Sequence, residues 1–442
     1  MVHLRSTALV LAGSIAASNA LVAQTFRDNI KSVVVLIQEN RSFDWFFGDL
    51  SYSTEIDNLR NLKRQLCNPA NVTSPNGSSI CATNSAANVS PDDPNHSVTG
   101  VAFQIFGTFH PDETVSPAEL LKAETMIGFL QEEENVLKSS NLSVAGETIN
   151  FISEDKIPVF RTMAENFVLF DRWFADVPGP TDPNRAYITS GASHGHGQND
   201  NGFSTFSLPQ RSIFQQLDEN GITWTNYFNS SFNPDAEFYT WTQTEGKVAT
   251  NVKPIENFFA DAKAGKLPQF TYINPECCSF DSMHPPSPIN TGEAWTKSIY
   301  EAVRGGPQWK NTLFLIAFDE HGGFADHVPP PVNVPNPDGL TYTETAGDGK
   351  NYTFDFNRLG VRVPALVISP WVKKGAIEHD GINGEGLTYT HSSLAAFISK
   401  LWNLDGGKPL TSRVAWASSF EHLITNTFRE DTPLVLPNPA AD

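Results

Sequence analysis

Short runs of apolar and β-branched residues recur along the chain between clusters of turn-forming residues. Such runs are typical of β-strands, and runs that are apolar at nearly every position are typical of strands covered on both faces of a sheet. The pattern predicts six strands, at residues 32–37, 167–170, 222–228, 270–273, 313–318 and 363–368.

Segments whose apolar residues follow helical spacing lie between these runs. They predict five helices, at residues 118–132, 213–219, 255–264, 293–304 and 392–402. Strands that alternate with helices favour an α/β sandwich built on a largely parallel sheet. We find no internal repeat and no low-complexity linker, so we expect a single continuous domain over residues 21–442.

Residues 51–98 depart from this pattern because they are polar, rich in Asn, Ser and Pro, and contain Cys67 and Cys81. We interpret this stretch as an excursion outside the sheet. With Cys277 and Cys278, the four cysteines allow three pairings, and their spacing does not resemble a zinc site. A bond between the adjacent Cys277 and Cys278 would be strained. We therefore expect at least one bridge from the excursion to this pair.

The first 20 residues resemble a secretory signal peptide. His3 and Arg5 precede an apolar run at residues 7–17, and small residues follow at positions 18–20. The run is too short to span a bilayer, and no later stretch approaches the roughly 20 apolar residues that a spanning helix needs. The last nine residues are polar and contain Pro, so we do not expect a lipid-anchored tail. The expected location is extracellular, in the medium or the cell wall, with no stable membrane anchor.

Charge and composition narrow the class of protein. The chain has 30 Lys and Arg against 49 Asp and Glu, a formal charge of −19, which argues against a nucleic-acid-binding protein. With 40% hydrophobic and 11% aromatic residues, the chain is not expected to be disordered. An anionic ligand would need a local source of positive charge.

Glycosylation sequons agree with export, and four of them cluster in the excursion, between Asn71 and Asn95. The expected glycosylation sites are Asn71, Asn76, Asn88, Asn95, Asn141, Asn229 and Asn351. A further sequon at Asn40 is expected to stay bare, because Asn40 follows a buried strand and is a candidate metal ligand. The oligomeric state is not indicated by the sequence.

Polar residues directly follow three predicted strands, where ligands bind in open parallel sheets. These segments are Gln38-Glu39-Asn40-Arg41, Asn274-Pro275-Glu276 and Asp319-Glu320-His321-Gly322-Gly323. Carboxylate and amide oxygens suit a divalent cation, and two strand ends can supply four of them. Alternatively, each acid could cap a following helix or lie in solvent.

The segment at residues 178–187 contains Pro, Gly and Thr181, followed by Pro183 near the start of an expected helix. A helix that begins here would direct its backbone N–H groups and the positive end of its dipole at Thr181, which would stabilise a phosphoryl group. The alternative is that Thr181 simply caps the helix, which is the commonest role of Thr at such a position.

Three longer motifs resemble the phosphoesterase family. They are the ten residues 39–48 from Glu39 to Gly48, the Thr-Asp-Pro-Asn-Arg run at 181–185 with Ser190-Gly191, and the block from Phe318 to Pro330. Smaller matches lie at 93–96, 284–286 and 360–371. The family includes bacterial phospholipases C and acid phosphatases, with secreted fungal acid phosphatases most similar, and belongs to the alkaline phosphatase-like superfamily.

The resemblance implies a three-layer α/β sandwich and a metal-dependent phosphoric ester hydrolase. It implies that one divalent cation of unknown identity is held by Glu39, Asn40, Asp319 and Glu320, with Thr181 near enough to coordinate it as the nucleophile. It also implies that His96, His284 and His327 surround the phosphate. Attack by Thr181 would give a phosphothreonine that water then hydrolyses, with His transferring protons.

Other polar residues are secondary candidates for the active site. His321 and His391 are secondary candidates, and His194 and His196 could line the pocket entrance. Arg41 and Arg185 could contact phosphate, but each is more simply expected to pair with a neighbouring acid such as Asp44 or Asp182. A full ligand set for a second metal, as in many enzymes of the superfamily, cannot be assembled.

The expected substrate is a small phosphate ester, and the expected activity is that of an acid phosphatase. The alternative is a phospholipase C that cleaves the glycerol–phosphate bond. The acidic charge disfavours anionic bilayers, and the many Phe residues are more simply interpreted as core. A secreted binding protein that kept the fold but lost catalysis is a remote alternative, because the nucleophile, oxygen ligands and His are all present.

Overall fold

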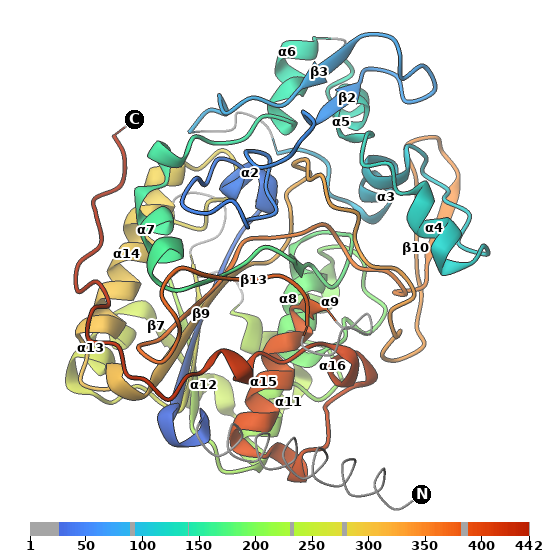
Figure 1. Ribbon diagram of the computed structural model, residues 1–442. Helices are drawn as coiled ribbons and strands as arrows, with labels where there is room; N and C mark the ends of the chain where they lie inside the picture. Colours follow the sequence, from blue (N-terminus) through green and yellow to red (C-terminus); the bar gives the residue numbers. More distant parts are fainter. Residues whose placement is uncertain are drawn as a thin grey trace, which may run out of the picture.

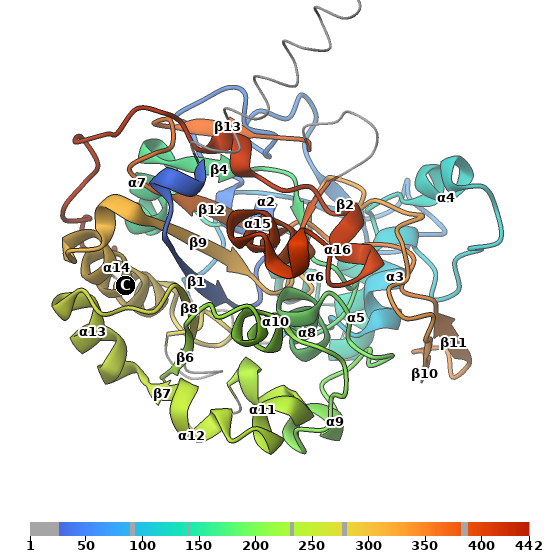
Figure 2. The same ribbon diagram turned by 90° about the horizontal axis from the view of Figure 1, so that it is seen from below.

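The computed structural model describes residues 26–88, 93–139, 141–229, 234–275, 281–381 and 388–441. The predicted signal peptide, Glu276, Cys277 and Cys278 lie outside the described residues. Figure 1 shows the course of the chain, and Figure 2 shows a central sheet with helices on both sides.

The central sheet has eight strands in the order β13-β4-β12-β9-β1-β8-β6-β7. Only β12 runs antiparallel to its neighbours β9 and β4, and the other pairings are parallel. The strands are β1 (Ser32–Gln38), β4 (Val168–Phe170), β6 (Trp224–Phe228), β7 (Val252–Pro254), β8 (Phe270–Asn274), β9 (Thr312–Phe318), β12 (Ala365–Ile368) and β13 (Ala376–Glu378). All six predicted strands are therefore confirmed, and so is the α/β fold with a largely parallel sheet.

Helices cover both faces of this sheet. In Figure 2, α7, α13 and α14 lie on one side, and α8, α10 and α15 lie on the other. The α-helices are α2 (Phe43–Phe47), α3 (Val98–Phe106), α4 (Pro117–Ala123), α5 (Phe129–Leu137), α6 (Leu142–Ala145), α7 (Pro158–Asn166), α8 (Thr181–Ser190), α9 (Asn201–Ser204), α10 (Ile213–Glu219), α11 (Thr240–Thr244), α12 (Lys247–Asn251), α13 (Ile255–Ala264), α14 (Ile289–Gly305), α15 (Ser392–Trp402) and α16 (Ser412–Trp416). Short 3-10 turns occupy Gly146–Thr148, Glu154–Lys156, Asp235–Phe238, Trp309–Asn311, Leu404–Gly406 and Glu421–Leu423.

The main hydrophobic core lies between the sheet and these helices. All seven residues of β1 and all seven of β9 are buried, which explains why both strands are apolar at nearly every position. The polar side chains that could form a site therefore lie just after the last residues of these two strands.

One predicted helix is wrong in its extent. Residues 118–123 form all but the first residue of α4, residues 129–132 begin α5, and residues 124–128 separate the two helices. Met126 adopts a left-handed conformation at φ 55°, and a β-carbon at Gly128 would lie 2.0 Å from the Phe103 carbonyl oxygen. The close approach of α3 therefore ends the helical path that the apolar spacing alone would continue.

The polar excursion lies outside the central sheet, as expected, and carries its own hairpin of β2 (Cys67–Pro69) and β3 (Ser79–Cys81). Two more small sheets pair β10 (Tyr342–Thr345) with β11 (Asn351–Phe354), and β5 (Trp173–Phe174) with β14 (Tyr389–Thr390). Cys67 and Cys81 face each other across the hairpin and form a disulfide with a Cα–Cα distance of 3.9 Å. The expected bridge from the excursion to Cys277 or Cys278 is therefore wrong, because the hairpin pairs both excursion cysteines locally.

Candidate active site

Strands β1 and β9 bring the predicted strand-end residues together. They pair in parallel from Ser32 with Thr312 to Gln38 with Phe318, so the two residues after each strand meet at one edge of the sheet. The Asn40 main-chain N–H donates to Asp319 Oδ1 at 3.3 Å. Glu39 is 3% exposed, and the other three side chains are completely buried: Asn40, Asp319 and Glu320. The predicted meeting of four oxygen-bearing side chains is confirmed.

A tight turn holds this edge in shape. Asn40 adopts a left-handed conformation at φ 59°, which Asn tolerates better than most residues. Gly322 has φ 65°, and a β-carbon there would lie 2.5 Å from the Asn40 carbonyl oxygen. The glycine after the Asp319-Glu320 pair is therefore needed for the two strand ends to approach each other.

Arg185 provides the main cation inside this cluster. From α8 its Nη2 contacts Glu39 Oε1 at 2.8 Å and its Nε contacts Asp319 Oδ2 at 3.1 Å. Its Nη1 lies 3.6 Å from Asp235 Oδ2. Arg185 therefore makes ion pairs, as expected, but with acids distant in sequence and not with the neighbouring Asp182.

One Arg does not balance the acids of the cluster. Burial raises the pKa of Glu320 well above its usual value, and the Asp319 carboxylate raises it further. Burial also raises the pKa of Glu39, although Arg185 lowers it, and raises the pKa of Asp319 to about 6 despite Arg185. The cluster is therefore short of positive charge.

Three oxygen atoms of the cluster are also short of hydrogen bonds. Among the described residues, none donates a hydrogen bond to Glu39 Oε2, Asn40 Oδ1 or Glu320 Oε1, and all three atoms are buried. Unpaired buried acceptors are costly, and together with the excess of acids they fit a divalent cation with oxygen ligands.

Thr181 is the first residue of α8, directly after Pro180 at the N-cap position. No side chain caps this helix, so the alternative role of Thr181 as a cap does not apply. Asn184 fixes the preceding turn, because its amide donates to the carbonyls of Val177, Gly179 and Pro180 at 3.0–3.1 Å. The Thr-Asp-Pro-Asn-Arg motif therefore places Thr181 at a helix N-terminus, while Arg185 reaches the acids one turn later.

A surface hollow of about 520 Å³ connects this helix start to the excursion. It is lined by Asp93, Pro94, Asn95, His96, Ser97, Val136, Pro180 and Asn199. Asn199 Oδ1 also accepts a hydrogen bond from the main-chain N–H of Asp182 at 2.8 Å. The hollow thus lies beside Thr181 and contains one of the predicted catalytic His.

His96 and His284 are oriented in the same way. The Nδ1 of each ring lies 2.7 Å from a main-chain carbonyl, that of Pro94 for His96 and that of Pro285 for His284. Because a carbonyl only accepts, Nδ1 carries the proton and Nε2 is left for the site. Nε2 of His96 lies 4.0 Å from Glu320 Oε1, and Nε2 of His284 lies 3.8 Å from Asp93 Oδ2.

Asp93 is a site residue that residue chemistry alone did not single out. Its Oδ1 accepts a hydrogen bond from Asn40 Nδ2 at 3.0 Å, and its Oδ2 faces His284. The only sequence signal for it was the short match at residues 93–96. Three elements distant in sequence thus meet at this carboxylate.

His327 lies in a different cluster. Its Nδ1 is 2.6 Å from Asp44 Oδ2 and its Nε2 is 3.0 Å from Asp57 Oδ1, so both ring nitrogens are engaged. Burial lowers the pKa of His327, but Asp44 and Asp57 outweigh this and raise it to about 9. His327 is therefore a cation held by two carboxylates, and the structure does not bring it together with His96 and His284.

Asp44, Asp326 and His327 form a group of possible metal ligands, with ligand atoms within 4.8 Å of one another. Arg362 already pairs with both acids, at 3.0 Å to Asp44 and 2.9 Å to Asp326. The expected pair of Arg41 with Asp44 is therefore wrong. The Arg41 guanidinium instead stacks between the rings of Trp45 and Phe324, at 4.5 and 4.8 Å.

The remaining predicted His residues have structural contacts. His391 Nε2 lies 2.6 Å from the Asp319 carbonyl oxygen, and His321 Nε2 lies 2.9 Å from Gln104 Oε1. Burial lowers the pKa of His391 to about 4 and that of His321 to about 3, so both are neutral at ordinary pH. His196 pairs with Asp200 at 2.7 Å, and His194 is exposed.

Two sequons have engaged side chains. Asn95 Nδ2 donates to Glu132 Oε1 at 2.7 Å, and Asn229 Nδ2 donates to Asp281 Oδ2. A glycan on either nitrogen would disrupt these hydrogen bonds, so we no longer expect glycans at these two positions. Asn40 is buried and bonded to Asp93, and its lack of a glycan stays a prediction.

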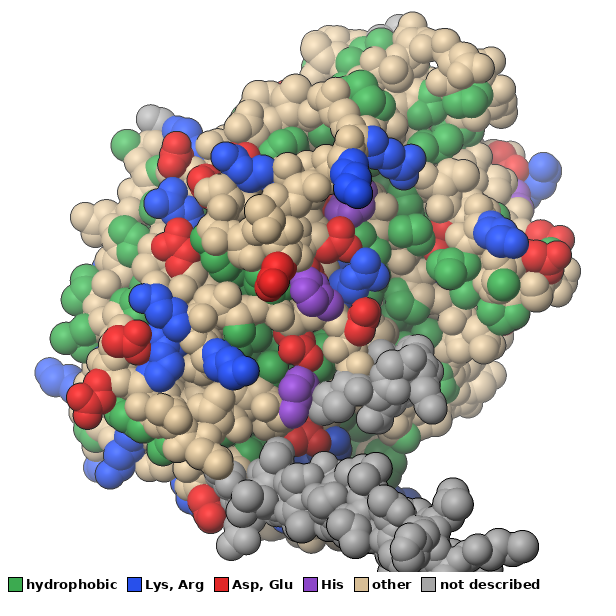
Figure 3. Space-filling view, in the orientation of Figure 1, with side chains coloured by type: hydrophobic (Ala, Val, Ile, Leu, Met, Phe, Trp, Pro, Cys, Tyr) green, Lys and Arg blue, Asp and Glu red, His purple; other side chains and the backbone are tan. Residues whose placement is uncertain are grey.

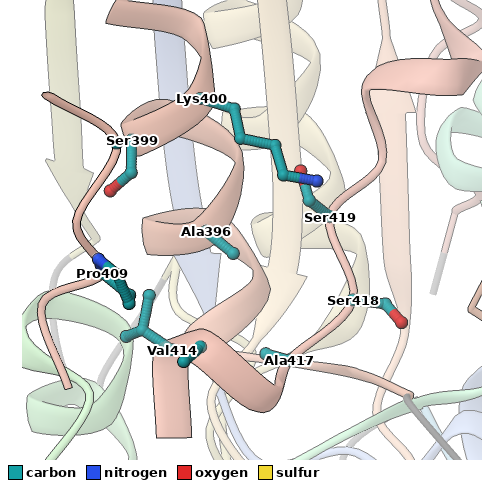
Figure 4. Close-up of a pocket in the computed structure, with 10 residues that line it drawn as sticks. Ala396, Ser399, Lys400, Pro409, Val414, Ala417, Ser418 and Ser419 are labelled. Atoms are coloured by element: carbon teal, nitrogen blue, oxygen red, sulfur yellow. The ribbon is translucent and has the colours of Figure 1, made fainter. Parts of the chain in front are cut away.

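A second hollow, of about 280 Å³, lies between α15 and α16. Figure 4 shows Ser399, Val414 and Ser418 among the residues that line it. None of the predicted site residues lines this hollow. It is therefore separate from the candidate active site.

Comparison with protein families gives a match over most of the chain, because a model described as the Phosphoesterase family matches residues 30–405. Non-specific phospholipase C5 of Arabidopsis thaliana is 38% identical over 425 residues, which cover 93% of this chain and 77% of that protein. Phospholipase C B of Mycobacterium tuberculosis is 27% identical over 450 residues, which cover 93% and 79%.

Solved structures that resemble the chain include a protein of the alkaline phosphatase superfamily from Vibrio parahaemolyticus, with 10% identity and a TM-score of 0.37 over 60% of this chain and 64% of that one. Murine ectonucleotide pyrophosphatase/phosphodiesterase 5 is 11% identical, with a TM-score of 0.37 over 61% of this chain and 95% of that one. Among the described residues, no helix is both long and apolar enough to cross a membrane.

Proposed function

The chain belongs to the phosphoesterase family and is a hydrolase of phosphoric ester bonds, and on this premise we propose that it is an acid phosphatase that uses Thr181 as its nucleophile. One divalent cation would be held by Glu39, Asn40, Thr181, Asp319 and Glu320. The observation that carries this proposal is the set of three buried oxygen atoms that accept no hydrogen bond from the described residues, in a cluster short of positive charge.

A bound cation would stabilise the deprotonated Thr181 hydroxyl and polarise the phosphoryl group. Arg185 holds the Glu39 and Asp319 carboxylates apart and in place through its two contacts. The start of α8 adds the positive end of its dipole at Thr181, where negative charge must be accommodated.

Thr181 Oγ1 attacks phosphorus, the bond from phosphorus to the leaving alcohol oxygen breaks, and a phosphothreonine forms. Water then attacks this phosphothreonine and releases phosphate. The Nε2 atoms of His96 and His284 are the proton carriers, since both Nδ1 atoms are bonded to carbonyls. Burial lowers the pKa of His284 although Asp93 raises it, so the form that can protonate a leaving oxygen is populated at acidic pH.

A small phosphomonoester fits the surroundings of this site. The hollow beside Thr181 is lined mainly by polar residues, and Val136 is its one aliphatic member other than Pro. On the face shown in Figure 3, hydrophobic side chains lie in small groups between polar and charged ones. The formal charge of −19 also disfavours an anionic membrane surface.

A phospholipase C activity is the second candidate. It is favoured by the relatives, since five Arabidopsis proteins at 36–38% identity are named as non-specific phospholipases C. Such an enzyme would cleave the glycerol–phosphate bond with the same nucleophile and cation. The chain would then need a lipid-contacting surface near the hollow.

A substrate panel separates the two candidates. The metal content of the purified protein is analysed, and the protein is assayed with p-nitrophenyl phosphate, with a phosphodiester and with phosphatidylcholine. We expect turnover of the monoester and none of phosphatidylcholine, and the reverse pattern would replace the first candidate by the second. Thr181→Ala should abolish turnover on either substrate while leaving the fold and metal content nearly unchanged, and unchanged turnover would remove Thr181 as the nucleophile.

We also propose that the protein is secreted and glycosylated at exposed sequons, on the basis of the signal-like sequence at residues 1–20 and the sequons at Asn71, Asn76 and Asn351. Peptide mapping of the protein from culture medium tests this. A mature N-terminus near residue 21 with glycans at these positions is expected, and retention of residues 1–20 would contradict export by cleavage.

A further inference from the structure

We propose that Asp93 is a positioning residue that sets the orientation of the Asn40 side chain, so that its oxygen faces the cation. This inference rests on the proposed function, because it concerns the same cation site. Asn40 Nδ2 donates to Asp93 Oδ1 at 3.0 Å, while Asn40 Oδ1 is buried and accepts no hydrogen bond from the described part of the chain.

The bond to Asp93 decides which end of the amide faces the acids. An ionised carboxylate only accepts hydrogen bonds, so it can contact the NH2 group of Asn40 but not the oxygen. Without Asp93, the NH2 group could turn toward Glu39 Oε2 and Glu320 Oε1, which accept no hydrogen bond from the residues that the structure describes. The amide would then place a donor where a cation needs an oxygen ligand.

The Asn40 main chain is already fixed by other contacts. Its N–H donates to Asp319 Oδ1 at 3.3 Å, and its carbonyl accepts from Arg41 Nη1 at 2.6 Å. These bonds fix the position of the residue but leave rotation of the terminal amide open. Among the contacts that Asn40 makes with described residues, only the bond from its Nδ2 to Asp93 distinguishes the two amide orientations.

The segment that carries Asp93 is itself anchored. The Asn95 carbonyl accepts from Gln104 Nε2 at 2.6 Å, and Asn95 Nδ2 donates to Glu132 Oε1 at 2.7 Å. Gly323 allows close packing here, since a β-carbon at this residue would lie 2.7 Å from the Asn95 carbonyl oxygen. Asp93 is partly exposed, with 43% of its side chain accessible, and the anchored Asn95 lies two residues after it.

The test measures cation affinity directly. Full-length protein is stripped with EDTA, and Mn²⁺ is titrated while the free ion is followed by electron paramagnetic resonance. Asp93→Ala removes the acceptor and should weaken Mn²⁺ binding about 10- to 100-fold, the usual range for residues that orient metal ligands. Asp93→Asn keeps an acceptor oxygen for Asn40 and should stay within about threefold of wild type.

Two controls separate orientation from charge. Asp112→Ala removes the same charge from an exposed loop residue that accepts hydrogen bonds from Thr114, and it should leave Mn²⁺ affinity unchanged. In an Asn40→Ala background, Asp93→Ala should cause no further loss, because there is no amide left to orient.

The outcomes are distinguishable. Equal affinity of Asp93→Ala and wild type would overturn the role of Asp93, and so would an equal loss in Asp93→Asn or an undiminished loss in the Asn40→Ala background. If wild-type protein binds no Mn²⁺ and Thr181→Ala retains turnover, the proposed function itself fails. Circular dichroism of each variant establishes that the changes in affinity arise in folded protein.

Discussion

Two clusters of carboxylates, all of them buried except the partly exposed Asp57, lie near the same edge of the central sheet, and they differ in how their charge is balanced. In the first cluster, Asp44, Asp57 and Asp326 are paired with Arg362, Arg172 and His327 at 2.6–3.0 Å. We call this the paired cluster. In the second, which we call the open cluster, Arg185 pairs with Glu39 and Asp319. Glu320 lies 3.8 Å from the neutral His321 and 4.0 Å from His96.

The difference shows that nearness of acids does not by itself define a metal site. The paired cluster has ligand atoms close enough for an ion, but its own cations neutralise it. The open cluster leaves three buried oxygens without a donor from the described residues and has carboxyl groups with raised pKa values. The paired cluster is therefore expected to stabilise the fold, and the open cluster to bind the cation and act in catalysis.

The largest expected effect is on activity, from a change in the open cluster. Glu320→Gln removes one negative charge and a candidate cation ligand, while the amide oxygen can still accept from the Gly322 N–H. Turnover should fall at least about 1,000-fold, a loss of about 4 kcal/mol in transition-state stabilisation. Stability of the metal-free protein should be kept or increased, since the lost charge was poorly compensated.

Steady-state kinetics and urea unfolding in EDTA measure both effects. A variant with near-normal turnover, or one strongly destabilised in EDTA, would show that the open cluster is as structural as the paired one.

The reverse result is expected for the paired cluster. Arg362→Met leaves Asp44 and Asp326 buried without their cation, and it also removes donors to the carbonyls of Asp57 and Asp171. The free energy of unfolding should fall by about 3–5 kcal/mol, as is usual when one partner of a buried ion pair is removed. Urea unfolding measures this change.

Arg60→Met is the matched control, because Arg60 pairs with Asp49 at 2.7 Å but its side chain is 45% exposed. This change should cost less than about 1 kcal/mol. Equal losses in the two variants would remove the distinction between a buried network and a surface pair.

A third prediction concerns the cation itself. At a concentration about 100 times its dissociation constant, a divalent cation should stabilise the folded protein by about 2.7 kcal/mol if it binds only the folded state. Thermal unfolding with EDTA and then with excess Mn²⁺ should show a rise in Tm for wild type. The rise should be largely lost in Glu320→Gln.

The matched change in the other cluster is Asp326→Asn, which should lower the stability but keep the increase in Tm with Mn²⁺. If Asp326→Asn and not Glu320→Gln abolished the increase, the cation would bind at the paired cluster.

The smallest expected effect is a pH dependence of the paired cluster. The pKa of His327 is raised from 6.5 to about 9 in the folded protein, so its contribution to stability is fully present below pH 6.5 and is lost as the pH rises to about 9. His327→Gln should therefore destabilise the protein by about 2 kcal/mol at pH 6 and by much less at pH 9.5.

The measurement is urea unfolding of both proteins at several pH values in EDTA, which leaves the open cluster metal-free throughout. A stability difference that did not change with pH would mean that His327 is not a buried cation.

Several helices and strands could be predicted from local pattern, because their buried positions follow a regular spacing of apolar residues along the chain. The bounds of α10, α13 and α15 match the predicted ranges, and six of the eight strands of the central sheet were predicted from apolar and β-branched runs. The short β7 and β13 were not predicted. The helix predicted at 118–132 could not be corrected from spacing alone, since its break depends on the approach of α3 to Gly128.

The candidate site was predictable to a similar degree. Glu39, Asn40, Asp319 and Glu320 follow two buried strands, and parallel pairing brings such ends together. The partners of Arg185 and His327 were not predictable in this way. Each side chain has several nitrogen atoms that can bind more than one acid. Which acids it contacts depends on packing between segments more than 100 residues apart.

The sequence by itself therefore determined which oxygen-bearing residues meet at the candidate site, because apolar runs place these polar residues at strand ends and the motifs fix their order. Only the tertiary structure decided which acids are neutralised and which remain open to a cation. That decision depends on where Arg185, Arg362 and Asp93 lie in space, and electrostatic balance in a buried site is set by distances that no linear pattern contains.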